Sequence, residues 1–128
     1  MHADPIIIFV CEHGAAKSII AAAHFNQLAN ERGLNLRAVA RGTNPDLGFS
    51  AKAMEGLQRE GLTLPEGAPQ KLTLAEVQSA QQIISFCELP EEFLDTANYE
   101  KWDDIPPVSE NYETARDMIL AKLMAIMK

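Results

Sequence analysis

The sequence predicts an α/β domain with a central parallel sheet, and two observations support this prediction. Apolar runs without polar alternation, such as residues 6–10, are typical of strands that are covered on both faces. These runs alternate along the chain with stretches whose apolar residues recur at helical spacing, such as 18–32. The chain has 128 residues and 47% hydrophobic content, so we expect a single domain, residues 1–128, around one core.

Strands and helices are predicted to alternate from the first element to the last. The order is strand 6–10, helix 18–32, strand 34–40, helix 49–60, a very short third strand at 71–72, helix 73–80, a fourth strand at 83–86 and a final helix from 109 onward. Thr73 and Glu76 form a capping-box pattern, and Ser109 is the expected N-cap of the final helix. Residues 88–108 show no periodicity, and a loop of this length in a small domain is usually functional.

The segment between the first strand and the first helix has the pattern of an anion-binding loop. Cys11 ends the strand. Backbone N–H groups in such a turn converge with the positive end of the helix, which attracts a phosphate-like oxyanion. The same field favours the thiolate form, so Cys11 is a candidate nucleophile. The expected oxyanion-binding residues are Glu12, His13, Gly14, Ala15, Ala16, Lys17 and Ser18.

Other interpretations of this segment follow from the same residues. Cys11 can be a small buried residue at a strand end, which is the commonest situation of an intracellular cysteine. A nucleotide-binding loop fits less well, because Ala16 and Cys11 occupy the two positions where that motif has glycine. A zinc site formed by Cys11, His13 and Cys87 lacks an evident fourth ligand, so we expect no metal and no other cofactor.

Charge and cysteine content restrict the partners and the location. A net charge of −7 disfavours nucleic acid and anionic membranes as partners, because like charges repel. The sequence shows neither the pattern of a signal peptide nor a transmembrane stretch. Two cysteines are too few for a disulfide framework, so we expect the cytoplasm.

A cysteine, five residues, a basic residue and a serine resemble the phosphate loop of the low-molecular-weight protein tyrosine phosphatases and of their relatives, the thioredoxin-coupled arsenate reductases. The family has arginine where this sequence has Lys17. His13 is similar to a histidine of many arsenate reductases, and Gly14 stands where those usually carry asparagine. Residues 40–43 are similar to the Ser-Ala-Gly-Thr that ends the family's second strand. The resemblance implies a three-layer domain, with a four-stranded parallel sheet in the order 2-1-3-4 and helices on both faces.

The resemblance also implies an acid. In the phosphatases an aspartate followed by proline protonates the leaving oxygen, and residues 102–106 are similar, although Ile105 interrupts the pair. Asp104 is the first candidate and Asp103 the second, and the alternative for both is a solvated acidic loop. The phosphatases also have an aromatic residue next to this aspartate that stacks on phosphotyrosine, and Ile105 offers no such platform.

Cys87 matches the second cysteine of the arsenate reductases, which attacks the first cysteine once that residue carries arsenic. The alternative is a buried residue at a strand end. Those enzymes have a third cysteine nearby, whereas residues 88–128 contain none. A Cys11–Cys87 disulfide would therefore require thioredoxin or another outside thiol for its reduction.

These observations predict a thiolate-based enzyme that acts on a small oxyanion, phosphate or arsenate, or on a phosphate monoester. The first hypothesis is arsenate-reductase-like chemistry, with Cys11 as the nucleophile and Cys87 as the candidate resolving cysteine. The second is a low-molecular-weight phosphatase that forms a cysteinyl-phosphate. The third is a catalytically silent anion-binding or interaction domain, in which Lys17 marks lost chemistry.

Overall fold

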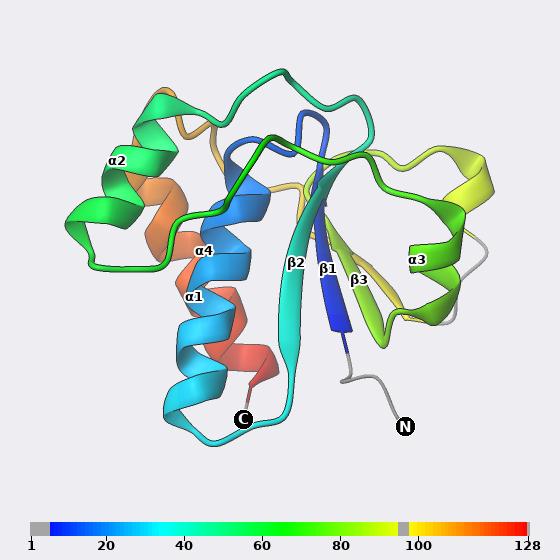
Figure 1. The fold of residues 1–128 in the computed structure, drawn as a ribbon, viewed down its shortest axis with the longest axis horizontal. Helices are drawn as coiled ribbons and strands as arrows, with labels where there is room; N and C mark the ends of the chain where they lie inside the picture. Colours follow the sequence, from blue (N-terminus) through cyan, green and yellow to red (C-terminus); the bar gives the residue numbers. More distant parts are fainter. Residues whose placement is uncertain (1–5, 95–97, 128) are drawn as a thin grey trace.

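The computed structural model describes residues 6–94 and 98–127. Its elements are β1 (Ile6–Cys11), α1 (Lys17–Glu31), β2 (Arg37–Gly42), α2 (Ala51–Arg59), α3 (Leu74–Ser79), β3 (Gln82–Ser85), the short 3-10 helix η1 (Glu91–Phe93), β4 (Tyr99–Lys101) and α4 (Tyr112–Ile126). The four strands form one parallel sheet in the order β2-β1-β3-β4. Helices α1, α2 and α4 cover one face of this sheet and α3 covers the other (Figure 1). The predicted fold class is confirmed.

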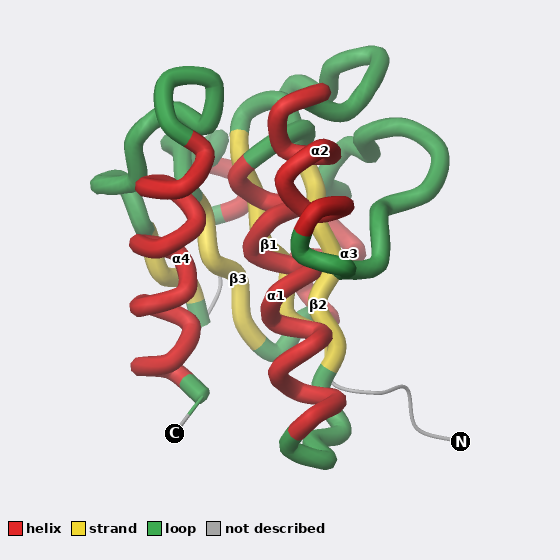
Figure 2. The backbone as a smooth tube through the Cα atoms, turned by 90° about the vertical axis from the view of Figure 1, so that its left-hand side faces the viewer, coloured by secondary structure: helices red, strands yellow, loops and turns green. Residues whose placement is uncertain are grey.

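Alternation along β1 builds a separate core on each face. Phe9 points toward α1 and α4, which run side by side in Figure 2, and belongs to the larger core. Ile8 and Val10 point the other way and pack with Leu72 and Val77. All three β1 residues are at most 1% exposed, which explains why this strand shows no polar alternation in the sequence.

The identities of the third and fourth strands differ from the prediction. Lys71 forms only an isolated bridge with Gly42, so no strand lies at 71–72. The stretch predicted as the fourth strand is β3. The fourth strand is β4, within the 88–108 segment that was predicted to be a loop. With three residues, largely exposed at the sheet edge, β4 is too short for a periodic pattern.

Helix and strand ends also shift from their predicted positions. β2 begins at Arg37, three residues after the predicted start. α4 is capped by Asn111, whose side chain accepts a hydrogen bond from the Thr114 N–H, and not by Ser109. The capping box of Thr73 and Glu76 at the start of α3 is confirmed.

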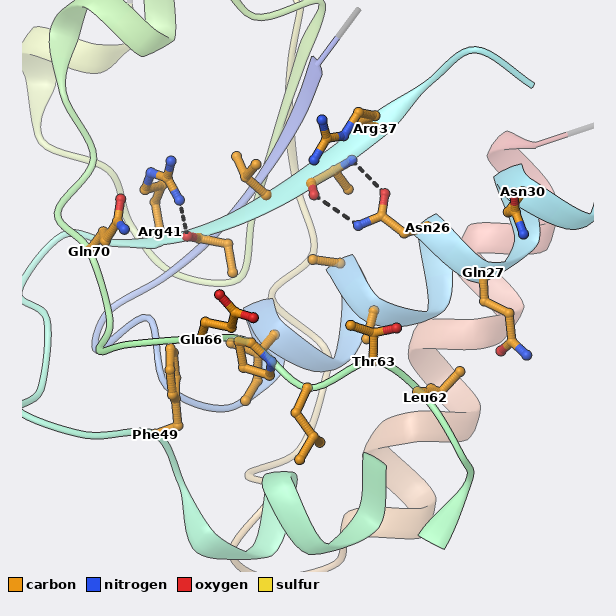
Figure 3. Close-up of a pocket in the computed structure, with 18 of the residues that line it drawn as sticks. Asn26, Gln27, Asn30, Arg37, Arg41, Phe49, Leu62, Thr63, Glu66 and Gln70 are labelled. Atoms are coloured by element: carbon orange, nitrogen blue, oxygen red, sulfur yellow. Dashed lines mark hydrogen bonds between the residues drawn. The ribbon is translucent and has the colours of Figure 1, made fainter. Parts of the chain in front are cut away.

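Groups from elsewhere in the chain form hydrogen bonds with the backbone of the edge strand β2. The Asn26 side chain accepts from the Ala38 N–H at 2.8 Å and donates to the Ala38 carbonyl at 3.0 Å, as Figure 3 shows. Gly42 is paired with the backbone of residues 70–72. A cavity of about 610 Å³ lies between α1, β2 and residues 61–70, and neither cysteine lines it. These contacts occupy an edge that would otherwise be open to strand pairing.

Candidate active site

Cys11 is the last residue of β1, at the carboxyl edge of the sheet. Residues 12–16 form the turn that leads into α1, and Gly14 adopts φ +63° within it. The Cys11 thiol is buried, and its Sγ atom lies 3.0 Å from Oγ of Ser18, which is completely buried. The Ser18 hydroxyl is therefore within hydrogen-bond distance of the thiol.

The carbonyl groups of this turn point away from the thiol, toward the segment 43–50. The bonds run from Thr43 N to Cys11 O (3.3 Å), from Asn44 N to Glu12 O (2.7 Å), from Asp46 N to His13 O (3.1 Å) and from Ser50 N to Ala15 O (2.9 Å). Within the described part of the chain, the N–H groups of residues 12–18 donate to no backbone or side-chain acceptor. These donors are available to a ligand that accepts several hydrogen bonds, and an oxyanion has this property.

Two glycines bring the turn and the end of β2 into direct backbone contact. A Cβ atom on Gly42 would lie 2.7 Å from the Gly14 nitrogen, and one on Gly14 would lie 2.9 Å from the Gly42 nitrogen. No side chain fits between these backbones without a shift. The Gly-Thr at 42–43 therefore serves to support the turn.

Lys17, the first residue of α1, bonds to the segment that leads into the cavity lining at 107–109. Its Nζ donates to the carbonyl oxygen of Ile105 at 2.8 Å. The side chain lines the same cavity as Cys11. The ammonium thus joins the turn to the segment that follows Trp102.

Both cysteines line one cavity of about 550 Å³. Neither forms a disulfide. Burial raises the pKa of Cys87, and the Cys11 thiol and the Glu12 carboxylate raise it further, while hydrogen bonds from Ser85 and Thr43 oppose the change. The other lining residues are Glu12, His13, Ala15, Ala16, Lys17, Asp46, Gly48, Phe49, Ser50, Phe86, Pro107, Val108 and Ser109.

Neither candidate acid lines this cavity. The Asp103 carboxylate is 3.7 Å from the Lys101 ammonium, and the Asp104 carboxylate is 3.2 Å from that of Lys122. Their side chains are 68% and 56% exposed. The 102–107 segment does reach the cavity that both cysteines line, but through Pro107 and not through a carboxylate. The reason is that Trp102 turns into the core against Phe9 and Phe86, which leaves the next two side chains outside.

The polar residues at the cavity mouth are exposed. His13 lies between two carboxylates, with Nδ1 3.2 Å from Asp46 and Nε2 3.6 Å from Glu12. Asp46 was not among the predicted site residues, since the sequence marks residues 42–46 only as a turn. Phe49, Ser50 and Val108 were missed because apolar or single hydroxyl residues in loops carry no chemical pattern. Among the described residues, no three His, Cys, Asp or Glu side chains are grouped to hold a metal ion.

A free cysteine at the end of the first strand, a turn of unpaired N–H groups and a buried serine, on a sheet of order 2-1-3-4, define a thiol-containing oxyanion-binding protein. The family model described as low molecular weight phosphotyrosine protein phosphatase matches residues 6–120. The chain belongs to this family of enzymes, as the resemblance of its phosphate loop predicts. In the described part of the chain, no helix has the length and apolar character needed to span a membrane.

Solved structures with this fold include proteins of different named activities. YfkJ from Bacillus subtilis superposes with a TM-score of 0.86 at 19% identity, over 98% of this chain and 94% of that one. A low molecular weight phosphotyrosine phosphatase from Vibrio cholerae O395 gives 0.80 at 16% identity, over 96% and 94%. An arsenate reductase from Archaeoglobus fulgidus DSM 4304 gives 0.76 at 20% identity, over 94% and 97%. A comparison with curated protein sequences finds no match.

Proposed function

We propose that this protein reduces arsenate to arsenite through Cys11 and Cys87. The observation that carries the proposal is the second free thiol: both cysteines line the same cavity, at the end where the turn offers its unpaired N–H groups. A phosphate monoester can be hydrolysed with one thiol. A two-electron reduction consumes two thiols, and the chain itself can supply both of them in this cavity.

The chemistry follows from the two thiols and the turn. The Cys11 thiolate attacks arsenic, so that a sulfur–arsenic bond forms and an arsenic–oxygen bond breaks, and that oxygen leaves as water with protons from solution. The N–H groups of residues 12–18 hold the remaining oxygens. The Cys87 thiolate then attacks the Cys11 sulfur. A disulfide forms, the sulfur–arsenic bond breaks, and its electron pair stays on arsenic, which leaves as arsenite.

This sequence of steps oxidises two thiols and reduces arsenic by two electrons. Thioredoxin or another outside dithiol must then reduce the disulfide, because the chain has no third cysteine. Two free thiols in one site fit a reducing compartment, and we place the protein in the cytoplasm. A formal charge of −7 supports a partner other than nucleic acid or an anionic membrane.

A phosphatase is the second candidate, and the family supports it. In that case Asp104, or else Asp103, is the acid, and the segment after Trp102 must turn to bring a carboxylate into the cavity. The oxygen that leaves arsenate also takes up protons, and in the steps above these come from solution. A third candidate is a catalytically silent anion-binding domain. The bond from Lys17 to Ile105 favours this candidate, because it occupies the ammonium group of the turn.

A single-turnover experiment separates these candidates. Reduced protein in excess is mixed with arsenate and no reductant, and the products are arsenite and a disulfide detected by peptide mass spectrometry. We expect one arsenite for each Cys11–Cys87 disulfide. Cys87→Ser should yield no arsenite, and Ser79→Ala, on α3, serves as a matched control that reacts like the unchanged protein.

Hydrolysis of an aryl phosphate is measured with the same proteins. Arsenite formation by Cys87→Ser at the unchanged rate would contradict the two-thiol reaction. Aryl phosphate turnover without arsenate reduction would favour the phosphatase. Phosphate binding without either reaction would favour the silent domain.

A further inference from the structure

Buried hydroxyl groups accompany both thiols of the site. In the part of the chain that the structure describes, the buried polar or charged residues are Ser18, Ser85 and His24. Ser18 contacts Cys11 and Ser85 contacts Cys87, and each serine is 0% exposed. Burial of a hydroxyl group costs free energy unless the group forms hydrogen bonds inside the protein. The proposed reaction gives no role to Ser85, so the burial of this serine beside Cys87 needs an explanation of its own.

Ser85 is the last residue of β3, two positions before Cys87. Its Oγ donates a 2.7 Å hydrogen bond to the Cys87 carbonyl and accepts a 3.2 Å hydrogen bond from the Cys87 N–H. The same oxygen lies 3.6 Å from the Cys87 Sγ. One hydroxyl thus contacts the backbone on both sides of Cys87 as well as its sulfur. These contacts fix the direction of a side chain that has left the strand.

We propose that Ser85 is the positioning residue of the second thiol. Its hydroxyl holds Cys87 toward the cavity and supplies a hydrogen bond to the sulfur when the thiolate forms. The use of this contact in disulfide formation rests on the proposed function, whereas the contact itself does not.

The surroundings of Cys87 explain why a donor is needed. Burial disfavours its thiolate, and the Cys11 thiol and the Glu12 carboxylate, which face it from the neighbouring strand and turn, disfavour it further. Burial raises the pKa of the Tyr99 phenol on β4, and the negative charge of Cys87 adds a smaller effect in the same direction. The Thr43 hydroxyl joins Ser85 in opposing the rise in the pKa of Cys87. The Ser85 hydroxyl donates to the Cys87 carbonyl while the thiol is neutral, and rotation about its C–O bond redirects the O–H toward the sulfur, as a hydrogen-bond donor, when the thiolate forms.

Alkylation of Cys87 tests this role without any assumption about turnover. In a Cys11→Ser background, the rate of modification by iodoacetamide is measured from pH 6 to 11, because burial raises the pKa of Cys87 above that of a free thiol, which is about 8.5. Ser85→Val and Ser85→Ala should move the midpoint of the rate profile upward by about one unit, which is about a tenfold loss of rate below the midpoint. Ser85→Thr should restore the profile, because it differs from the valine variant by the hydroxyl alone. Ser79→Ala, which loses a hydroxyl bonded only to carbonyls of its own helix, is the control.

Circular dichroism and thermal unfolding confirm that the variants are folded, and the alanine and valine changes provide two chances of a folded protein. A profile of either folded variant that superimposes on the serine protein would overturn the proposal. So would failure of threonine to restore it.

Single-turnover arsenite formation, with Cys11 present, then connects the contact to the reaction. If Ser85→Val shifts the alkylation profile and slows disulfide formation about tenfold, both inferences stand. If the profile shifts but the unchanged protein makes no arsenite, the proposed function fails and the role of Ser85 stands. If arsenite forms and the profile does not shift, the role of Ser85 fails alone.

Discussion

The Nζ atom of Lys17 donates a 2.8 Å hydrogen bond to the carbonyl oxygen of Ile105, a residue 88 positions later in the chain. A second lysine acts on the same segment: Nζ of Lys52 donates to the carbonyl oxygen of Ser109, also at 2.8 Å. Pro107, Val108 and Ser109 form the wall of the cavity between these two bonds. The segment that forms this wall is therefore hydrogen-bonded to two lysine side chains, one from α1 and one from α2.

Loss of the first bond is expected to cost more than loss of the second. Ile105 is 4% exposed, so in Lys17→Met water cannot readily replace the bond that its carbonyl oxygen loses. The Lys52 bond is exposed, so in Lys52→Met water can replace it. We expect Lys17→Met to lower the free energy of unfolding by about 1–3 kcal/mol. Lys52→Met should lower it by less than about 1 kcal/mol. Urea unfolding of the two variants checks the difference, and equal losses would contradict the greater contribution expected of the Lys17 bond.

The contact between Gly14 and Gly42 predicts that a methyl group on either residue opens the anion site. Gly14→Ala combines a left-handed backbone with a Cβ that would lie 2.9 Å from the Gly42 nitrogen. Gly67 is the matched control, because it has φ +72° and nothing within 4 Å of the added atom. Gly67→Ala should cost about 1–2 kcal/mol from the backbone alone. Gly14→Ala should cost a further 1–3 kcal/mol, roughly, from overlap, and should weaken phosphate binding in calorimetry, whereas equal costs would contradict the close contact.

The side chains whose positions the sequence predicts correctly are those that depend on local structure. A buried strand followed by a glycine-containing turn and a helix fixes Cys11 at the base of the cradle, and parallel strands place Cys87 at the same edge of the sheet. Both features need only short-range patterns and one rule of topology. The two cysteines therefore appear in one cavity as the sequence implies.

The residues that the sequence misplaces lie in irregular segments or bond across long separations. No periodicity constrains residues 102–109, so the sequence does not reveal that Trp102 turns inward and Asp104 outward. The partner of Lys17 is a backbone carbonyl, which every residue possesses and no motif marks. No sequence pattern identifies Ser85 either, because a serine near a strand end is common. The role that we propose for it depends on its complete burial beside Cys87.

Phosphate is expected to protect Cys11 from alkylation. In a Cys87→Ser background, iodoacetate reacts with one thiol only, and an oxyanion held by the N–H groups of residues 12–18 blocks the approach of this anionic reagent. We expect saturable protection by phosphate or arsenate and little by chloride at the same ionic strength. Cys11→Ser should still bind phosphate, because the donors are backbone groups. A loss of phosphate binding in calorimetry on Cys11→Ser would contradict the backbone origin of the site.

His24 on α1 predicts how stability changes with pH. It is buried, and its Nε2 lies 3.3 Å from the carboxylate of Glu60, which also accepts hydrogen bonds from Tyr112 and Arg116. Burial lowers the pKa of His24 below 6.5, despite the opposing effect of Glu60. The unfolded chain therefore binds more protons as the pH falls below 6.5, and the free energy of unfolding should decrease there by at most about 1.4 kcal/mol per pH unit.

The pKa of Glu60 is lowered as well, chiefly because hydrogen bonds from Tyr112 and Arg116 outweigh the effect of its burial. Its contribution is complete above pH 4.5 and is lost only as the pH falls further, so the two groups act in different intervals. His24→Gln should remove the decrease between pH 6.5 and 5 and leave the loss below 4.5 in place. Urea unfolding at half-unit steps of pH measures both intervals. A variant whose stability still falls with the same slope between pH 6.5 and 5 would show that another group titrates there.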